Sequence, residues 1–405
     1  MPSSRRSYLA AAVATGIAGC TGWLPGGDTT ENVEPADRRV TRLPDPGADE
    51  WFRPARSFAN DLVAPEATPP QDDPSQRWAE PTTDPVRSVV VADGRVIVGT
   101  REAVVAIGLE DGSREWETDD GSGLLSVVEG RCYARSDDAV VALDAETGER
   151  EWRYETERFG AEPVEFDGTV YVTDADGLVG LHADTGDVRW TVDDVHHGGT
   201  LAIDDGRLHW TTVDAHRILD LEGPSPPEER PEIPLYGDES IVTPVAPAVD
   251  GSTIALGGFD DGDRQRAPVR LLSTNGMVWS RPFERAVQTP ALLDERVLAV
   301  GYDNRAAALD ESVVAAFDRE TTELDWETTI PEPAGPPTVA DGTIYLGGSY
   351  PSETRGVTGR LFALDAETGA VRWERETDGT SAGHPLAVVD DAIVIGTQRG
   401  IVTLE

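Results

Sequence analysis

Histidine and cysteine are the residues of this chain whose side chains could coordinate a metal or carry a redox reaction. His196 and His197 are adjacent, but neighbours in an extended chain point to opposite sides, which suits shared metal ligation poorly. A zinc site would need a further ligand at a defined spacing, and the sequence offers none. The six histidines are therefore interpreted as solvated loop side chains, with a specific metal site as the alternative: His182, His196, His197, His209, His216 and His384.

Other kinds of catalytic motif are also missing from the sequence. It contains no Gly-x-Ser-x-Gly, Walker loop or His-Glu-x-x-His pattern. The many Asp-Gly pairs could collect Ca²⁺ or Na⁺, but they recur along the chain as turn chemistry. Cys132 lies in a strand-like pattern, 130–134, and is expected to be a small buried residue. We therefore predict no catalytic, cofactor-binding or metal-binding residue.

The N-terminus has the pattern of an export signal. Twin arginines at Arg5 and Arg6 precede the small apolar stretch 10–18, and residues 17–20 (Ile-Ala-Gly-Cys) resemble a lipobox that would make Cys20 the lipid-modified first residue. The alternative is a chance pairing of two arginines with an alanine-rich stretch. The apolar run is too short to span a bilayer, so anchoring would depend on the lipid.

These features divide the chain into three expected parts. Residues 1–20 would be a twin-arginine lipoprotein signal. Residues 21–50, rich in Gly, Pro, Thr, Asp and Glu, would be a disordered acidic tether. Residues 51–405 would be the folded domain, exported and anchored by lipid on the outer face of the cell membrane.

The charge balance is strongly acidic. The chain has 75 Asp and Glu against 34 basic residues, all of them arginine, and a formal net charge of −41. Self-repulsion of this size destabilises an ordinary fold at low salt, and halophiles exploit it. We therefore predict a cell-surface protein of a halophilic archaeon, with an acidic protein made for a basic partner as the alternative. Nucleic-acid binding is excluded, because phosphate contacts need a basic surface.

One pattern recurs along the chain and must position any functional residue. Ala-x-Asp-x-x-Thr-Gly-x-x-x-Trp is complete at 142–152 and at 363–373. The tryptophans that end successive units are Trp78, Trp116, Trp152, Trp190, Trp279, Trp326 and Trp373, at gaps of 38, 36, 38, 89, 47 and 47 residues. The gap of 89 residues covers two units, one of which has lost its tryptophan. Periods of roughly 20–50 residues indicate a repeat architecture.

Each period contains short β runs separated by Asp-Gly or Thr-Gly turns, which predicts four antiparallel strands per unit, as in a propeller blade. Seven units end before residue 374, and residues 385–404 hold three strands of an eighth. A strand near Trp78 can supply the fourth and close the ring without an exposed edge. We therefore predict an all-β, eight-bladed β-propeller, with seven blades as the alternative.

The repeat resembles the PQQ-like (quinoprotein dehydrogenase-type) β-propeller family over most of residues 84–405. Some units depart from its motif: Gly108 and His182 replace Asp, Gly180 replaces Ala, and Thr322 replaces Gly. In that family the tryptophan packs against the motif alanine and glycine of the neighbouring blade, so the resemblance implies structural docking roles for all seven tryptophans. Residues 51–60 resemble the Trp…Arg…Asn lead-in that often precedes the first blade of prokaryotic members.

The same resemblance bears on cofactors. Quinoprotein dehydrogenases use a quinone with Ca²⁺ held by Asp, Glu and Asn, a catalytic Asp, and commonly an adjacent cysteine pair. The mature chain would have a lipidated Cys20 and a lone Cys132, and no motif matches the Ca²⁺ ligands. PQQ and Ca²⁺ are therefore not expected.

Units differ in length mainly because one connecting link is longer in some of them. The last three full units have longer links between their second and third strands, at 259–267, 303–312 and 349–360. Such links emerge on one face of a propeller, and insertions on one face often mark the binding face. We expect a partner-binding surface there, with length drift in solvated loops as the alternative. Its candidate residues supply scarce cationic and aromatic groups: Arg264, Arg266, Arg305, Tyr350 and Arg355.

The favoured function is a non-enzymatic, lipid-anchored scaffold that binds another cell-surface protein, similar in architecture to BamB-type propellers. The alternative is an exported oxidoreductase that uses PQQ and Ca²⁺ in the central funnel.

Overall fold

The computed structural model describes residues 46–405 with short gaps, and the described residues belong to one compact unit, Arg39–Glu405. The gaps are residues 122, 137, 157–159, 175–176, 194–200, 213–214, 222–225, 227, 236–241, 261–266, 284–285, 303–310, 349–358 and 378–385. The described residues form strands and turns without a helix, so none of them belongs to a helix that could cross a membrane. The expected signal at 1–20 lies outside the described residues.

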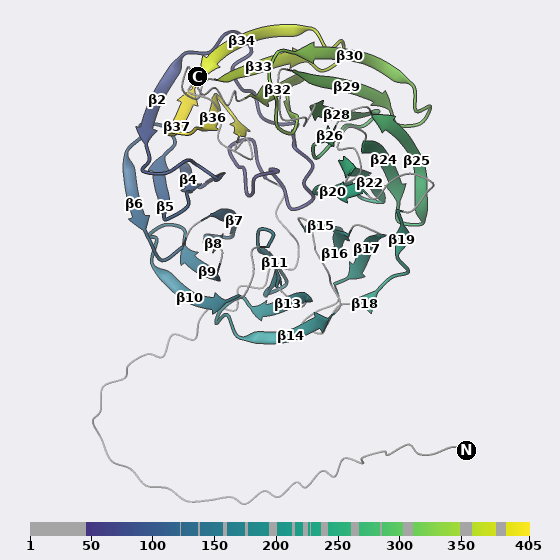
Figure 1. The fold of residues 1–405 in the computed structure, drawn as a ribbon. Helices are drawn as coiled ribbons and strands as arrows, with labels where there is room; N and C mark the ends of the chain where they lie inside the picture. Colours follow the sequence, from purple (N-terminus) through teal and green to yellow (C-terminus); the bar gives the residue numbers. More distant parts are fainter. Residues whose placement is uncertain are drawn as a thin grey trace, which may run out of the picture. The chain divides into compact units, whose positions relative to one another are not determined.

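Eight antiparallel sheets form a ring, which confirms the eight-bladed propeller rather than the seven-bladed alternative (Figure 1). Blade 1 contains β3 (Ser88–Ala92), β4 (Arg95–Gly99), β5 (Val104–Gly108) and β6 (Arg114–Thr118). Blade 2 contains β7 (Leu124–Val128), β8 (Arg131–Arg135), β9 (Ala139–Asp144) and β10 (Arg150–Glu155). Blade 3 contains β11 (Val164–Phe166), β12 (Thr169–Thr173), β13 (Gly177–His182) and β14 (Val188–Asp193).

Blade 4 differs in its outer strand, which is broken in two. It contains β15 (Ala202–Asp204), β16 (Arg207–Thr211), β17 (Ala215–Asp220), β18 (Glu228–Glu229) and β19 (Ile233–Pro234). Blade 5 contains β21 (Ala248–Asp250), β22 (Thr253–Leu256), β24 (Ala267–Ser273) and β25 (Gly276–Phe283). Blade 6 contains β27 (Ala291–Leu292), β28 (Arg296–Tyr302), β29 (Ser312–Asp318) and β30 (Leu324–Ile330).

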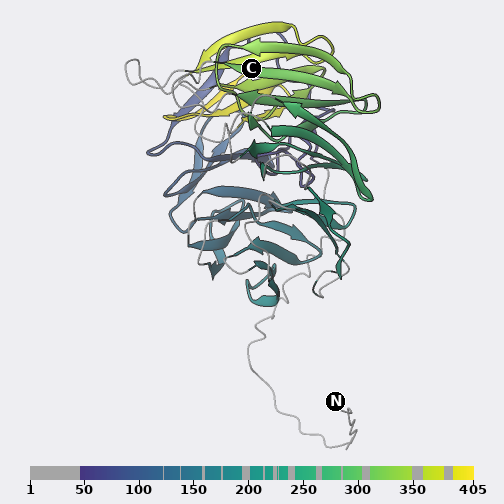
Figure 2. The same ribbon diagram turned by 45° about the vertical axis from the view of Figure 1, so that its right-hand side comes forward.

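The last two blades involve the N-terminal part of the described chain. Blade 7 contains β31 (Thr338–Ala340), β32 (Thr343–Gly347), β33 (Gly359–Asp365) and β34 (Val371–Thr377), and β1 (Val63–Ala64) pairs with β31 in parallel. Blade 8 contains β35 (Leu386–Val389), β36 (Ala392–Gly396), β37 (Gly400–Leu404) and β2 (Gln76–Pro81). Pairing of β2 with β37 confirms that the strand bearing Trp78 closes the ring. The oblique view shows the blue-purple N-terminal strands beside the yellow C-terminal ones, and β2 shares a sheet with β37 (Figure 2).

The recurrent turns explain why the blades form hairpins. Asp167 and Gly168 both have positive φ, 49° and 68°, which a two-residue hairpin that follows the strand twist requires. In the wider turn of the motif, Asp144 Oδ1 accepts hydrogen bonds from the amides of Glu146 and Thr147, at 3.0 and 2.8 Å. The motif aspartate therefore shapes a turn.

Tryptophan joins one blade to the next. Trp152 of blade 2 is 6 % exposed, and its Nε1 donates to the backbone oxygen of Ala183 in blade 3. Its ring lies over Gly186, where an added methyl group would stand 2.7 Å from Trp152 Cε3. The equivalent bonds from Trp78, Trp116 and Trp279 reach the carbonyls of Leu109, Ala145 and Arg319.

The seam between blades 7 and 8 uses a variant of this contact. In blade 8 the strand that pairs with β37 is β2, from the N-terminal part of the chain, so no motif turn joins these two strands. Trp373 Nε1 donates instead to the backbone oxygen of Gln71, 2.9 Å away, in the segment that leads into β2. The N-terminal segment thus completes both the sheet and the docking site of the last blade.

Blades 5 and 6 share an additional ladder. The short strands β20 (Val242–Pro244), β23 (Gly258–Asp260) and β26 (Ala286–Val287) pair in that order and join β28 of blade 6. The long link expected at 259–267 therefore begins as a strand, and its residues 261–266 lie outside the described residues.

The glycine under Trp152 provides a matched test of docking. Gly186 and Gly206 have nearly the same φ, 73° and 68°, but no atom lies within 4 Å of a methyl group added at Gly206. We expect Gly206→Ala to lower the free energy of unfolding by only the ~1–2 kcal/mol that a left-handed alanine costs. Gly186→Ala should lower it by a further ~1–3 kcal/mol, because the added methyl group forces the indole of Trp152 to move. Thermal unfolding in molar salt measures the difference, and equal melting temperatures for the two variants would contradict the docking role.

Candidate functional site

A single stretch of chain, residues 46–68, runs through the centre of the ring; we call it the axial segment (Figure 1). Its backbone oxygens accept hydrogen bonds from the innermost strands of blades all around the ring. Trp51 exchanges two bonds with Val91 of blade 1, at 2.7 and 2.8 Å. Further amides donate to it from blades 2, 4, 5, 7 and 8: Val127 to Phe52, Ile203 to Phe58, Val249 to Ala59, Val339 to Leu62 and Asp390 to Ala48.

Side chains of the axial segment fill the channel at this level. Trp51, Arg53 and Phe58 are 0, 1 and 2 % exposed. Arg53 Nη1 donates to Leu201 O at 2.9 Å, and Nη2 donates to Glu162 at 3.4 Å. Burial lowers the pKa of Arg53, and the Glu162 carboxylate opposes that shift. The guanidinium is thus a buried cation matched by one carboxylate and one peptide oxygen.

This arrangement tests whether a quinone with Ca²⁺ fits the channel. At the inner-strand level, the buried indole of Trp51, ring of Phe58 and guanidinium of Arg53 take up space that a flat multi-ring cofactor on the axis would need. Within the described ranges, no three His, Cys, Asp or Glu side chains are grouped so as to hold a metal ion. The residues that the structure describes do not fit the cofactor.

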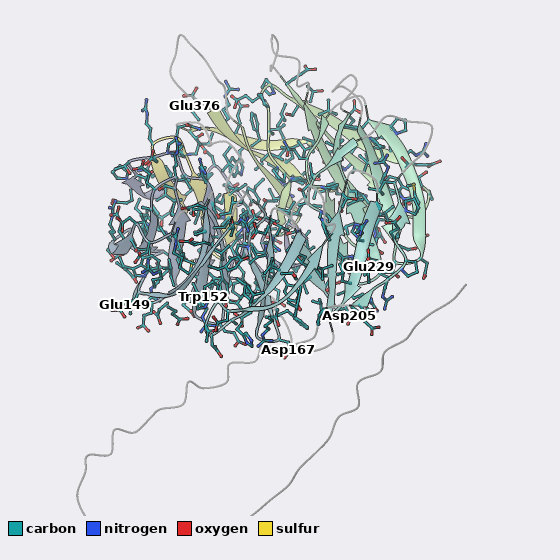
Figure 3. The ribbon with its side chains drawn as sticks, turned by 60° about the horizontal axis from the view of Figure 1, so that its bottom comes forward. Glu149, Trp152, Asp167, Asp205, Glu229 and Glu376 are labelled. Atoms are coloured by element: carbon teal, nitrogen blue, oxygen red, sulfur yellow. The ribbon has the colours of Figure 1, made fainter. Side chains whose placement is uncertain are left out.

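A hollow of about 1360 Å³ opens beside the axis on the face that carries the first hairpin turn of each blade. Asp167 and Asp205, in the turns of blades 3 and 4, lie at this edge of the ring, and Glu376 lies at the opposite edge (Figure 3). Carboxylates from the axial segment and from blades 4, 5 and 6 line it, including Asp61, Glu66, Asp204, Asp250 and Asp294. Its two arginines are paired, Arg56 with Asp61 at 3.5 Å and Arg296 with Asp325 at 2.7 Å. The hollow is acidic and presents no catalytic constellation.

A buried polar cluster lies between blades 2 and 3. Tyr133 donates a short hydrogen bond to Glu165, and Arg131 contacts Glu151 at 2.5 Å and Glu165 at 4.0 Å. Burial raises the pKa of Glu165 to about 6. Shifted pKa values can mark a functional site, but Tyr133 and Glu165 are 0 and 2 % exposed and pack beneath Trp152, whose ring centroid lies 5.8 Å from that of Tyr133. The cluster joins two blades.

The structure corrects the interpretation of two histidines. His209 on β16 and His216 on β17 are fully buried rather than solvated, because both are strand residues whose side chains point toward blade 5. Their rings share a hydrogen bond of 3.2 Å, and His216 Nδ1 bonds to Thr211 at 2.9 Å. His182 is exposed as expected, while His196, His197 and His384 lie outside the described residues.

The predicted partner-binding residues are not described. Arg264, Arg266, Arg305, Tyr350 and Arg355 lie in the gaps 261–266, 303–310 and 349–358. Cys20 also lies outside the described residues, whereas Cys132 is buried on β8 as expected. Sequence reasoning singled out the Trp…Arg…Asn lead-in only as a resemblance and missed its place on the axis.

Comparison with known proteins gives the fold and the family. The chain has 13 % identity to quinohemoprotein alcohol dehydrogenase from Comamonas testosteroni, with a TM-score of 0.65, covering 91 % of this chain and 83 % of that one. A europium-containing methanol dehydrogenase, at 13 % identity, gives 0.62 over 87 and 90 %. BamB from Moraxella catarrhalis, at 16 % identity, gives 0.53 over 83 and 92 %. At these identities the likeness shows the propeller fold alone.

No curated protein sequence matches the chain. A family model described as outer membrane protein assembly factor BamB matches residues 70–192 and 310–405, and these ranges contain complete copies of the tryptophan motif. Because the match covers more than half of the sequence, the chain belongs to this BamB-type family of PQQ-like β-propellers.

Proposed function

We propose that the chain is a non-enzymatic scaffold that binds another protein on the surface of a halophilic archaeal cell. The observation that carries this proposal is the filled axis: Trp51, Arg53, Phe58 and Asn60 occupy the channel at the level of the inner strands. A propeller whose centre is packed with its own side chains has its faces and rims left for function. BamB, which shares this family, is named as an assembly factor.

The binding surface is proposed to be the face that carries the long links of blades 5, 6 and 7. Support comes from the ladder β20–β23–β26–β28, because the first of these links begins as a paired strand that bridges two blades. Loops held on a rigid scaffold commonly carry recognition. Arg264, Arg266, Arg305, Arg355 and Tyr350 in these links offer positive charge and aromatic area on a chain of net charge −41.

Shortening the links tests this surface. Residues 261–266, 303–310 and 349–358 are each replaced by Asp-Gly, which keeps the flanking strands. We expect the amount of partner protein that cross-links to the chain on intact cells at high salt to fall at least tenfold relative to the wild type. A second variant keeps the links and changes Arg264, Arg266, Arg305 and Arg355 to Ser.

The control removes four arginines from outer strands elsewhere: Arg114, Arg150, Arg153 and Arg372→Ser. It should retain the cross-link. Undiminished capture by the shortened chain would reject the proposed surface.

A separate test addresses the non-enzymatic role. Adding PQQ with Ca²⁺ in molar salt should leave the melting temperature of the protein unchanged, and a higher melting temperature or reduction of a dye would reject that role.

Attachment to the membrane is proposed to depend on a lipid at Cys20. We expect Cys20→Ser to move most of the protein from the membrane fraction to the medium, because a thioether-linked lipid can no longer form. Cys132→Ala is the matched control, since that thiol is buried on β8, and it should remain with the membrane. Retention of Cys20→Ser in washed membranes would contradict the anchor.

A further inference from the structure

The seam between blades 4 and 5 lacks the tryptophan contact on both of its sides. The outer edge of blade 4 is broken between β18 and β19 and carries no tryptophan. The receiving turn of blade 5 is shortened to two residues, since Ser273 pairs directly with Gly276. No atom lies within 4 Å of a methyl group added at Gly276, whereas Gly148 and Gly186 each lie against an indole.

Smaller side chains fill this seam in place of the indole. Ile218 and Ile233 of blade 4 pack with Ile254 and Leu272 of blade 5 in a small aliphatic cluster. The remaining space on the blade 4 side holds the buried pair His209 and His216. A seam closed by small aliphatic and imidazole groups buries less apolar area than one closed by tryptophan, so we expect weaker cohesion there.

The axial segment bonds to both blades at this seam with consecutive residues. Phe58 O accepts from Ile203 N of blade 4 at 2.6 Å, and Ala59 O accepts from Val249 N of blade 5 at 2.8 Å. The side chain of Asn60 then spans the two blades. Its Nδ2 donates to Leu201 O, just before β15, at 3.2 Å and to Pro247 O, just before β21, at 3.0 Å.

Asparagine is well suited to this position for two reasons. Asn60 has φ of 56°, a left-handed conformation that asparagine tolerates better than most residues. Its amide group also has two donors, which matches the two carbonyl oxygens that it bridges. The residue is fully buried, so the two bonds are shielded from water.

We propose that the seam between blades 4 and 5 is where this ring opens, and that Asn60 is the latch that holds it shut from the channel. The latch stands in for the absent tryptophan: it fastens the inner ends of the two blades where the outer ends have no dock. Asp204 Oδ2 of blade 4 adds one bond across the same seam, to Gly251 N at 2.6 Å.

Thiol labelling reports opening of this seam. Ile218→Cys places a reporter on the buried face of blade 4, and the native Cys132, buried in blade 2, serves as an internal reference; Cys20 is replaced by Ser in every protein. Asn60→Asp keeps the size of the side chain but removes both donors and adds a charge facing two carbonyl oxygens. We expect labelling at position 218 to accelerate at least tenfold relative to Cys132.

Asn275→Asp is the matched control, because it adds the same charge to an exposed turn at the same seam. It should leave both labelling rates unchanged. Equal acceleration at 218 and at Cys132 in Asn60→Asp would mean general loosening and would overturn the latch, as would no acceleration at all.

Amide exchange of the unaltered protein tests the same idea if Asn60→Asp does not fold. The backbone amides of β16 and β17 in blade 4 should exchange through seam opening faster than those of β8 and β9 in blade 2. The blade 2 strands lie beside a seam that keeps its tryptophan contact. Equal or slower exchange in blade 4 would overturn the proposal.

Acid should open the same seam. Burial lowers the pKa of His209 to about 4 and that of His216 well below its usual range. Arg207 and Arg230 of blade 4 also lower the pKa of His209, and both pair with Asp220, which shares the face of β17 with His216. Asp204 of blade 4 and Arg270 of blade 5 also lie on the two faces that meet at this seam.

The sign of the pH effect follows from these shifts. An exposed histidine has a pKa near 6.5, so between about pH 6.5 and pH 4 the open form binds protons that the closed form does not, and closure is weakened as pH falls. His209 alone should raise the ratio of labelling at 218 to that at Cys132 about twentyfold from pH 7 to pH 5.

Two variants identify the source of the acid effect. The exposed His182→Gln is the control and should keep the full acid effect, whereas His209→Gln with His216→Gln should remove it. An unchanged acid effect in the double variant would show that other groups govern the seam.

Discussion

A ring of sheets holds together only if every blade buries enough surface against the next. In this chain tryptophan supplies much of that surface. Trp152 lies over Gly186 of the neighbouring turn and donates to the backbone oxygen of Ala183, and Trp78 and Trp116 repeat the arrangement over Gly112 and Gly148. The requirement governs much of the sequence: a glycine with positive φ beneath the ring, a small residue beside it and an aspartate that shapes the turn. The same residues are consequently unavailable for chemistry.

The axial segment meets a second requirement, which is that the inner strands of a propeller converge on a channel that must be either solvated or filled. Here the chain fills it with its own Trp51, Arg53 and Phe58. The buried charge of Arg53 is tolerated because Glu162 and the carbonyl oxygen of Leu201 receive its donors. Since the segment bonds to inner strands around the ring, it couples blades that do not touch one another.

Strong negative charge places its own constraint on such a fold. The carboxylates concentrate in exposed turns and in the hollow beside the axis, where salt can screen them, while buried acids such as Glu162 and Glu165 are each matched by an arginine. Where the pattern of docking lapses, between blades 4 and 5, the seam is filled by neutral imidazoles and fastened by an uncharged amide. Neither the imidazoles nor the amide adds a charge to the interior, where salt could not screen it.

Much of the architecture was predictable from the sequence, because hairpin turns and docking tryptophans are local patterns that repeat at a regular spacing. Residues 142–152 specify their own turn. The last three strands of the sequence made an incomplete blade, which required a fourth strand near Trp78. Positions without a repeat to compare were harder: His209 and His216 have strand neighbours, yet their burial depends on blade 5, which lies far from them in sequence. The role of Asn60 was equally hidden, since its partners Leu201 and Pro247 lie 141 and 187 residues away. The sequence alone thus determined which segments become blades and how the ring closes, because those depend on short-range turn chemistry and periodic burial. The tertiary structure decided what occupies the channel and which seam lacks its tryptophan dock, because those contacts form only after the ring brings distant strands to a common axis.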